Sequence, residues 1–227
     1  MADYLDAEWH IPRSSYVSLR RPRISGTALV GGLHLATGNY GTASPWRLAV
    51  SGAAIAALLG IAMAMTYIEL WIVDQFTGQT LSAGLLGLRG GGGMPPSEVL
   101  ALVAQLLPML NFLIVLRLSP MAGYHAAEHK VVSAIERYGR LQYEQVVEMP
   151  RAHPRCGTVL LFGVLPTLLI AYPLLWSNPL AAGVVAVVGW MLRYRVGYFI
   201  QQTFTTKPPT PRQLAAGIAA GEKLLAL

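Results

Sequence analysis

The chain has 227 residues, of which 54% are hydrophobic and 12% are charged, and its formal net charge is +6. Soluble domains usually contain about 25% charged residues, so this composition excludes an ordinary soluble protein and predicts a membrane protein. The basic residues form no stripe interleaved with aromatic residues, which argues against a nucleic-acid-binding protein.

Residues 1–45 are predicted to form a cytoplasmic N-terminal arm. This stretch contains three acidic residues and four arginines and has no apolar core near its start, so it does not resemble a secretory signal. Its two histidines, His10 and His34, are expected to be surface residues.

Four apolar stretches follow the arm, and each is long enough to cross a bilayer, which needs about 20 residues as a helix. They cover residues 48–73, 99–116, 159–176 and 180–200. We therefore expect an all-α, polytopic membrane protein with four transmembrane helices, in which residues 1–227 form a single membrane domain. Asn111 in the second span is expected to hydrogen-bond to a neighbouring helix, whereas Glu69 and Asp74, near the outer end of the first span, are expected to face water.

The distribution of lysine and arginine predicts the topology. Of the 17 basic residues, 16 lie before the first span, between the second and third spans, or in and after the fourth. The exception is Arg89, in the loop with the run Gly90 to Gly93, which we interpret as a flexible tether. The positive-inside rule then places both termini, the segment 119–156 and the tail 207–227 in the cytoplasm. The expected location is the cytoplasmic (inner) membrane.

The segment between the second and third spans contains the most informative motif, H-x-x-E-H. A helix is predicted from Gly123 to Tyr138, ended by Gly139. Two histidines four residues apart, His125 and His129, share one face of such a helix and can bind one metal ion. Glu128 lies about 60° around the helix from His125. This is the inverted zinc-protease pattern, in which the glutamate is the catalytic base for a metal-bound water.

A second cluster, His153-Pro154-Arg155-Cys156-Gly157-Thr158, lies at the start of the third span. Cys156 is expected near a helix N-terminus, where the helix dipole favours a thiolate. Together with His125 and His129, the pair His153 and Cys156 is predicted to form a metal site, with zinc as the expected ion and iron or copper as alternatives. Four bound ligands indicate a closed structural site, whereas three leave a position for water and give Glu128 a role as general base.

Two further elements are predicted around these motifs. Glu136 lies seven residues beyond His129, about 10 Å along the helix, and is therefore expected beside the ligands and not among them. Residues 210–227 resemble a short amphipathic helix with Pro211 in its first turn. The single cysteine, Cys156, excludes an intrachain disulfide and fits a reducing compartment.

The stretch Tyr124-His125-Ala126-Ala127-Glu128-His129-Lys130, followed by His153-Pro154-Arg155-Cys156-Gly157-Thr158, resembles the YqhQ-like family of bacterial membrane proteins. Its pattern is roughly Y-H-G-A-E-H-K and then H-P-R-C-G-T. The tail from Gln202 to Pro209 and the stretch from Gly26 to Leu33 resemble flanking motifs of that family more weakly. The resemblance implies a multi-pass membrane protein of uncharacterised function that acts as a metal-dependent enzyme.

The chain departs from that family pattern at three acidic positions, which here are Gly31, Pro208 and a position near Ala215. If these carboxylates serve catalysis in relatives, this chain retains the metal site but has lost catalytic turnover.

Three functions therefore remain open. The first is a metal-dependent membrane enzyme, such as a zinc hydrolase, at the cytoplasmic membrane surface. The second is a non-catalytic structural or accessory subunit of a larger membrane complex, in which the His/Cys motif serves structure. The third is a haem- or chlorophyll-binding protein, which we disfavour because histidines at i and i+4 cannot clamp one haem from both sides. Membrane lipid is the expected partner, together with other membrane proteins or a second copy of the chain.

Overall fold

The computed structural model describes residues 24–29, 32–37, 45–87 and 98–226. Four long helices dominate these residues, and all four are long and apolar enough to cross a membrane. They are α2 (Pro45–Thr77), α4 (Glu98–Leu118), α7 (Gly157–Ser177) and α8 (Pro179–Ile200). The expected all-α fold with four candidate transmembrane helices is confirmed. The glycine run from Gly90 to Gly93 lies outside the described residues.

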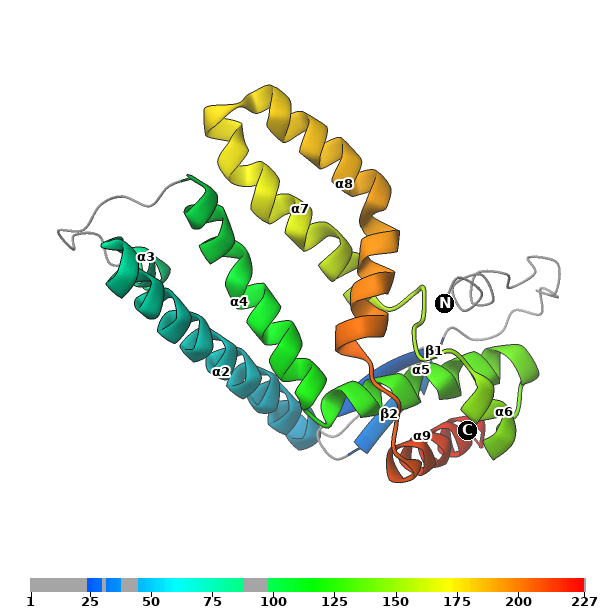
Figure 1. The fold of residues 1–227 in the computed structure, drawn as a ribbon. Helices are drawn as coiled ribbons and strands as arrows, with labels where there is room; N and C mark the ends of the chain where they lie inside the picture. The colour runs from blue at the N-terminus through cyan, green and yellow to red at the C-terminus, as the bar shows by residue number, and fades with distance from the viewer. Residues whose placement is uncertain (1–23, 30–31, 38–44, 88–97, 227) are drawn as a thin grey trace.

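The four helices form two antiparallel pairs, α2 with α4 and α7 with α8 (Figure 1). The two pairs lie closest to each other near the C-terminal end of α8 and diverge toward the opposite end. Glycines allow α7 and α8 to pack very closely. A Cβ atom added at Gly197 would lie 1.9 Å from the backbone oxygen of Val159, and one at Gly163 would lie 2.0 Å from that of Arg193. Backbone-to-backbone packing of this kind is typical of helices that associate in membranes.

Polar side chains join α2 to α4. Asn111 is 2% exposed and donates hydrogen bonds to the Thr66 hydroxyl (2.9 Å) and to the Glu69 carboxylate (2.7 Å). The predicted interhelical role of Asn111 is thus confirmed. The expectation that Asp74 faces water is wrong. Its buried carboxylate accepts hydrogen bonds from the backbone of Leu81 and from the backbone and hydroxyl of Ser82, at the start of the short helix α3 (Leu81–Leu85).

The remaining elements form a compact layer at one end of the spans (Figure 1). They are the strands β1 (Ile24–Leu29) and β2 (Gly32–Thr37) and the helices α5 (Met121–Tyr138), α6 (Tyr143–Glu148) and α9 (Pro211–Leu225). The core of this layer lies between α5, α6, α9 and β2, and it includes Val131, Val146, Leu214, Leu224 and Leu35.

The antiparallel β1–β2 hairpin was not predicted, because residues 1–45 were interpreted only as a cytoplasmic N-terminal arm. Leu35 on β2 is 4% exposed and belongs to the core with α5 and α9. The helical predictions for this layer are confirmed. Gly139 ends α5 with a left-handed φ of 66°, and a capping box between Thr210 and Gln213 starts α9.

The fourth span does not end as a regular helix. After Ile200, α8 continues as a π-helix, η2 (Gln201–Thr205), which lies against both α4 and α5. The backbone N–H and the hydroxyl of Thr206 both donate hydrogen bonds to the Gln201 carbonyl, at 2.9 and 2.8 Å. π-Helical turns are rare and are frequently found at functional sites.

Candidate metal centre

The helix α5 places His125 and His129 one turn apart on one face. Their ring centroids are 4.3 Å apart, with the rings in an edge-to-face arrangement. His129 is 3% exposed, and His125 is partly buried. The predicted sharing of one face by the two imidazoles is therefore present in the structure.

Backbone carbonyls fix the orientation of both imidazole rings. The Nδ1 atom of His125 lies 2.9 Å from the carbonyl oxygen of Thr205, and that of His129 lies 2.7 Å from the carbonyl oxygen of Arg151. A carbonyl only accepts, so each Nδ1 carries the proton and donates. The lone pair of each neutral ring is then on Nε2, which is the arrangement found in histidine ligands of metal sites.

Cys156 completes a cluster with the two histidines. It occupies the N-cap position of α7, and its Sγ atom lies 3.3 Å from Nε2 of His125 and 3.2 Å from the hydroxyl of Thr158. One potential ligand atom from each of His125, His129 and Cys156 lies within 4.8 Å of the other two. Two nitrogen or sulfur ligands of a tetrahedral zinc ion are about 3.5 Å apart, so small side-chain movements bring all three atoms to one ion.

The electrostatic surroundings favour the metal-binding form of His129. Burial lowers the pKa of His129 well below its usual value of 6.5, and the charges of His125 and His153 lower it further. The hydrogen bond to the Arg151 carbonyl acts in the opposite direction but does not compensate. The ring is therefore neutral at neutral pH, as a metal ligand must be.

The structure places His153 beside the cluster, with its ring centroid 5.8 Å from that of His129. Both of its ring nitrogens already have partners. The Nδ1 atom accepts a hydrogen bond from the backbone N–H of Arg155 (3.3 Å), and Nε2 lies 3.4 Å from the carboxylate of Glu136. Glu136 also forms an ion pair with Arg155. The sequence grouped His153 with the other three ligands, whereas here it lies between the cluster and Glu136.

Glu128 directly precedes His129 in the sequence and is buried, with 8% of its surface exposed. Its carboxylate is not one of the three ligand atoms that lie within 4.8 Å of one another. Of the five residues proposed from the sequence, the structure brings His125, His129 and Cys156 together. His153 and Glu128 are not part of this group.

The sequence did not indicate the role of Gln201. This side chain is fully buried; it accepts a hydrogen bond from the backbone N–H of His153 (2.9 Å) and donates one to the Thr158 hydroxyl (3.1 Å). Thr158 in turn contacts Cys156. Gln201 thus connects the end of the fourth span to the loop that carries Cys156. The available signal was a polar glutamine directly after an apolar span.

Comparison with known proteins gives a family but no function. No curated protein and no solved structure matches the chain. The family described as Protein of unknown function (DUF1385) matches residues 47–196, a range that includes nearly all of the first candidate span, the second and third spans, most of the fourth and both histidine motifs. The chain belongs to this family.

Proposed function

We propose that this protein is a metal-dependent membrane enzyme, a hydrolase, with a zinc ion held by His125, His129 and Cys156. The observation that carries the proposal is the orientation of both imidazoles, whose Nδ1 atoms donate hydrogen bonds to backbone carbonyls, together with the grouping of one potential ligand atom from each of His125, His129 and Cys156 within 4.8 Å of the other two. Two imidazoles and a thiolate are a donor set that suits zinc.

Three protein ligands are typical of catalytic zinc sites, in which the ion keeps one position open and supplies an activated water as nucleophile. Glu128 lies next to His129 on the same helix and is the residue that we propose as general base, taking up the proton of the attacking water on its carboxylate. Gln201 and the carbonyls of Thr205 and Arg151 hold the ligands in place and have no part in proton transfer.

One observation favours a second function, that of a non-catalytic subunit with a structural metal site. The His153 ring is 5.8 Å from that of His129, so rotation away from Glu136 would add a fourth ligand. A closed site with four protein ligands leaves no position for water and is structural. The same chain would then be an accessory component of a membrane complex.

The metal content of the purified, full-length protein tests the proposal. The wild type is expected to hold about one zinc ion per chain, and the double variant His125→Ala/His129→Ala to hold none. His10→Ala is the control, because His10 is an expected surface residue. Absence of metal in the wild type would overturn the enzyme proposal.

Two further variants separate the catalytic from the structural site. His153→Ala is expected to retain zinc if three residues bind it and to lose most of it if four do. In the cobalt-substituted protein, Cys156→Ser is expected to abolish the thiolate-to-metal charge-transfer absorption, because the sulfur ligand is gone. Persistence of that absorption would show that Cys156 is not a ligand.

A further inference from the structure

Two arginines that form no ion pair within the described part of the chain lie beside the candidate metal centre. Arg117, in the last turn of α4, donates a hydrogen bond to the carbonyl of Thr206, and Arg151, in the loop before α7, has its carbonyl 2.7 Å from Nδ1 of His129. Both are partly buried, and neither pairs with a carboxylate of the described residues. The Nε atom of Arg151 is buried without a hydrogen-bond partner within that part of the chain.

Such an arrangement is unfavourable unless an anion completes it. Partial burial weakens the hydration of each guanidinium group, and the second positive charge adds repulsion. The positive-inside rule accounts for many arginines at this end of the spans, but it requires only that they lie on one side of the membrane and not that two are buried together.

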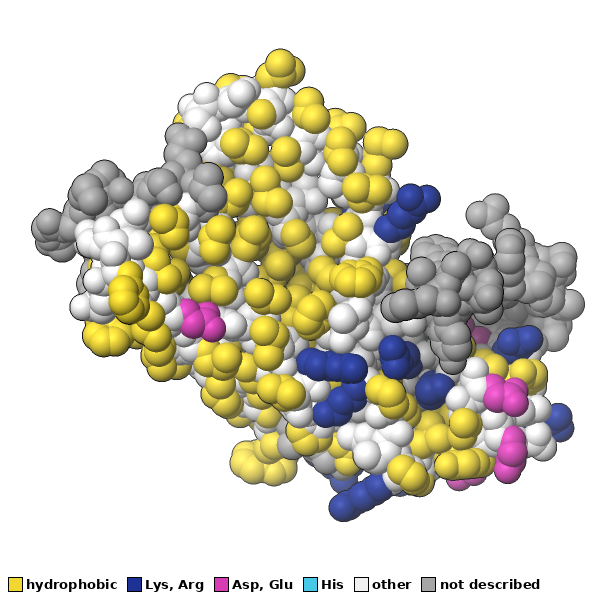
Figure 2. Space-filling model, in the orientation of Figure 1, with side chains coloured by type: hydrophobic (Ala, Val, Ile, Leu, Met, Phe, Trp, Pro, Cys, Tyr) yellow, Lys and Arg dark blue, Asp and Glu magenta, His cyan; other side chains and the backbone are white. Residues whose placement is uncertain are grey.

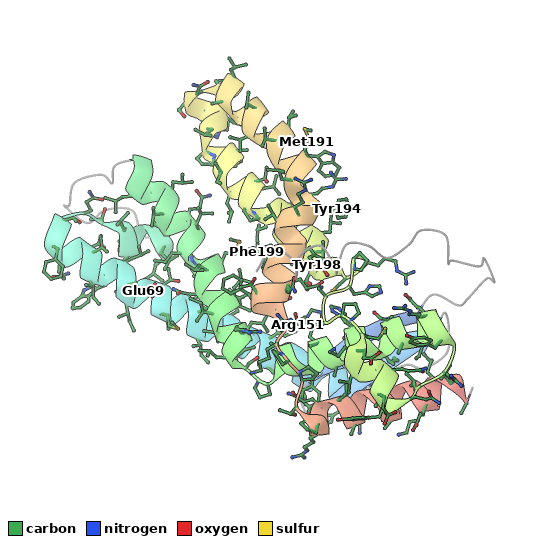
Figure 3. The ribbon with its side chains drawn as sticks, turned by 45° about the vertical axis from the view of Figure 1, so that its right-hand side comes forward. Glu69, Arg151, Met191, Tyr194, Tyr198 and Phe199 are labelled. Atoms are coloured by element: carbon green, nitrogen blue, oxygen red, sulfur yellow. The ribbon has the colours of Figure 1, made fainter. Side chains whose placement is uncertain are left out.

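The arginine pair is linked through the backbone to the two histidine ligands. Arg117 donates a hydrogen bond to the carbonyl of Thr206, whose neighbour Thr205 orients His125 through its own carbonyl. The carbonyl of Arg151 orients His129. Figure 3 shows Arg151 at the junction between the end of α8 and α5. An anion bound by the two guanidinium groups would therefore lie at the edge of the candidate metal centre.

The pair also lies at the border between the apolar spans and the polar layer. Lysine and arginine side chains gather along this border in Figure 2, whereas apolar side chains cover the spans. Leu118, directly after Arg117, is 75% exposed, and Phe199, near the end of α8, is 62% exposed. At such a border the phosphate of a phospholipid meets the arginines while its acyl chains contact exposed apolar side chains.

We propose that Arg117 and Arg151 bind the phosphate group of a membrane phospholipid. Phospholipids are then the class of substrate presented to the metal centre; this second statement rests on the proposed function. Guanidinium groups bind phosphate through paired, charge-assisted hydrogen bonds, and two of them surround its oxygens better than one. Lys207 lies nearby, with its ammonium group 3.2 Å from the Leu118 carbonyl, and adds positive charge.

Binding of three probes to the delipidated, full-length protein in detergent tests this proposal. The probes are a short-chain phosphatidylglycerol, the diacylglycerol with the same acyl chains, and inorganic phosphate. We expect the wild type to bind the phosphatidylglycerol most tightly, because only this probe offers both the phosphate and the acyl chains. The double variant R117Q/R151Q should bind it at least about tenfold more weakly, since several charge-assisted hydrogen bonds are lost. Arg212→Gln, an exposed arginine on α9, is the matched control and should bind as the wild type does.

Two results would overturn the proposal. Equal phosphatidylglycerol affinity in the wild type and in R117Q/R151Q would show that these arginines bind no headgroup. Binding of inorganic phosphate as tight as that of phosphatidylglycerol would assign the site to a soluble phosphate. If the glutamine variant does not fold, R117K/R151K keeps both charges, loses the paired hydrogen bonds and should show a smaller but measurable weakening.

Metal analysis of the same samples keeps this proposal separate from the proposed function. R117Q/R151Q is expected to retain its metal, and the variant H125A/H129A is expected to retain phosphatidylglycerol binding. A wild type without metal but with arginine-dependent binding would leave the phosphate site in place and remove only its link to a metal centre.

Discussion

At the scale of single residues, the two histidines of the candidate metal centre are oriented by polar groups that are not themselves proposed ligands. The carbonyls of Thr205 and Arg151 accept hydrogen bonds from Nδ1 of His125 and His129, which leaves the lone pair of each ring on Nε2. Gln201 connects η2 to the loop before α7. In known metal sites, loss of such supporting groups weakens metal binding about 10- to 100-fold. Cys156 is held in a similar way, because the Thr158 hydroxyl contacts its sulfur and accepts a hydrogen bond from the Gln201 amide.

Replacement of Gln201 by leucine is expected to lower the metal affinity about 10- to 100-fold while all proposed ligands remain. The free energy of unfolding should also fall by about 1–3 kcal/mol, because the backbone N–H of His153 and the Thr158 hydroxyl lose their buried partner. Competition with a chelator measures the affinity. Gln75→Leu, an exposed glutamine on α2, is the control, and equal affinities in the two variants would contradict the supporting role.

The group of Glu136, His153 and Arg155 predicts a pH dependence of stability. Burial alone would raise the pKa of Glu136, but the hydrogen bond with His153 and the positive charge of Arg155 bring it below its ordinary value of 4.5. The unfolded chain therefore takes up this proton more readily than the folded one. The stabilisation is complete above pH 4.5 and is lost as the pH falls through the lower, folded-state pKa.

Unfolding of the detergent-solubilised protein from neutral pH to below pH 4.5 tests this expectation. The wild type should lose more stability on acidification than Glu136→Gln, in which this titration is absent. Glu222→Gln, an exposed position on α9, should behave as the wild type does. The same acid sensitivity in the Glu136 variant would show that other groups govern the response.

At the scale of helices, the close contact of α7 with α8 positions Cys156. The contact depends on Gly163 and Gly197, which face the backbone of the opposite helix. Gly197 lies against Val159, and Val159 is only three residues after Cys156. Gly197 itself is four residues before Gln201. A change in the distance between these helices therefore moves the proposed sulfur ligand relative to α5.

Gly197→Ala is expected to destabilise the protein by about 1–3 kcal/mol and to weaken metal binding, because the new Cβ would lie 1.9 Å from a backbone oxygen. Gly183→Ala tests the same substitution on α8 at an open position, where no atom lies within 4 Å of the new Cβ, and should have little effect. Thermal unfolding and chelator competition measure both variants. Similar behaviour of the two variants would mean that the helices separate without consequence for the site.

Regular elements were predictable because their signals are local. The long apolar runs gave the four candidate spans, and Gly139 marked the end of α5. Contacts between distant segments were not predictable in this way. The hairpin around Leu35 depends on packing against α5 and α9, and the buried position of Asp74 depends on the start of α3. The spacing of His153 did not reveal its interaction with Glu136, since that contact requires a particular course of the loop before α7.

At the scale of the whole molecule, the polar layer and the candidate metal centre lie at one end of the spans (Figure 1). The cytoplasmic orientation that we expect for this end rests on the charge distribution alone. All basic residues but Arg89 lie before the first span, between the second and third spans, or in and after the fourth, and none lies in the turn Ser177–Pro179 between α7 and α8. A cytoplasmic metal centre would encounter substrates from inside the cell or from the inner leaflet.

Cysteine labelling in intact cells tests this topology, with Cys156→Ser as the background so that no native thiol remains. Ser177→Cys, in the exposed turn between α7 and α8, should react with a membrane-impermeant maleimide added outside. Ala226→Cys, exposed after α9, should react only after the cells are permeabilised. The reverse pattern would place the metal centre outside, where the preference of basic residues for the cytoplasm argues against it. Labelling of both positions from the same side would contradict the membrane crossing of α8, because this helix alone separates the turn from the tail.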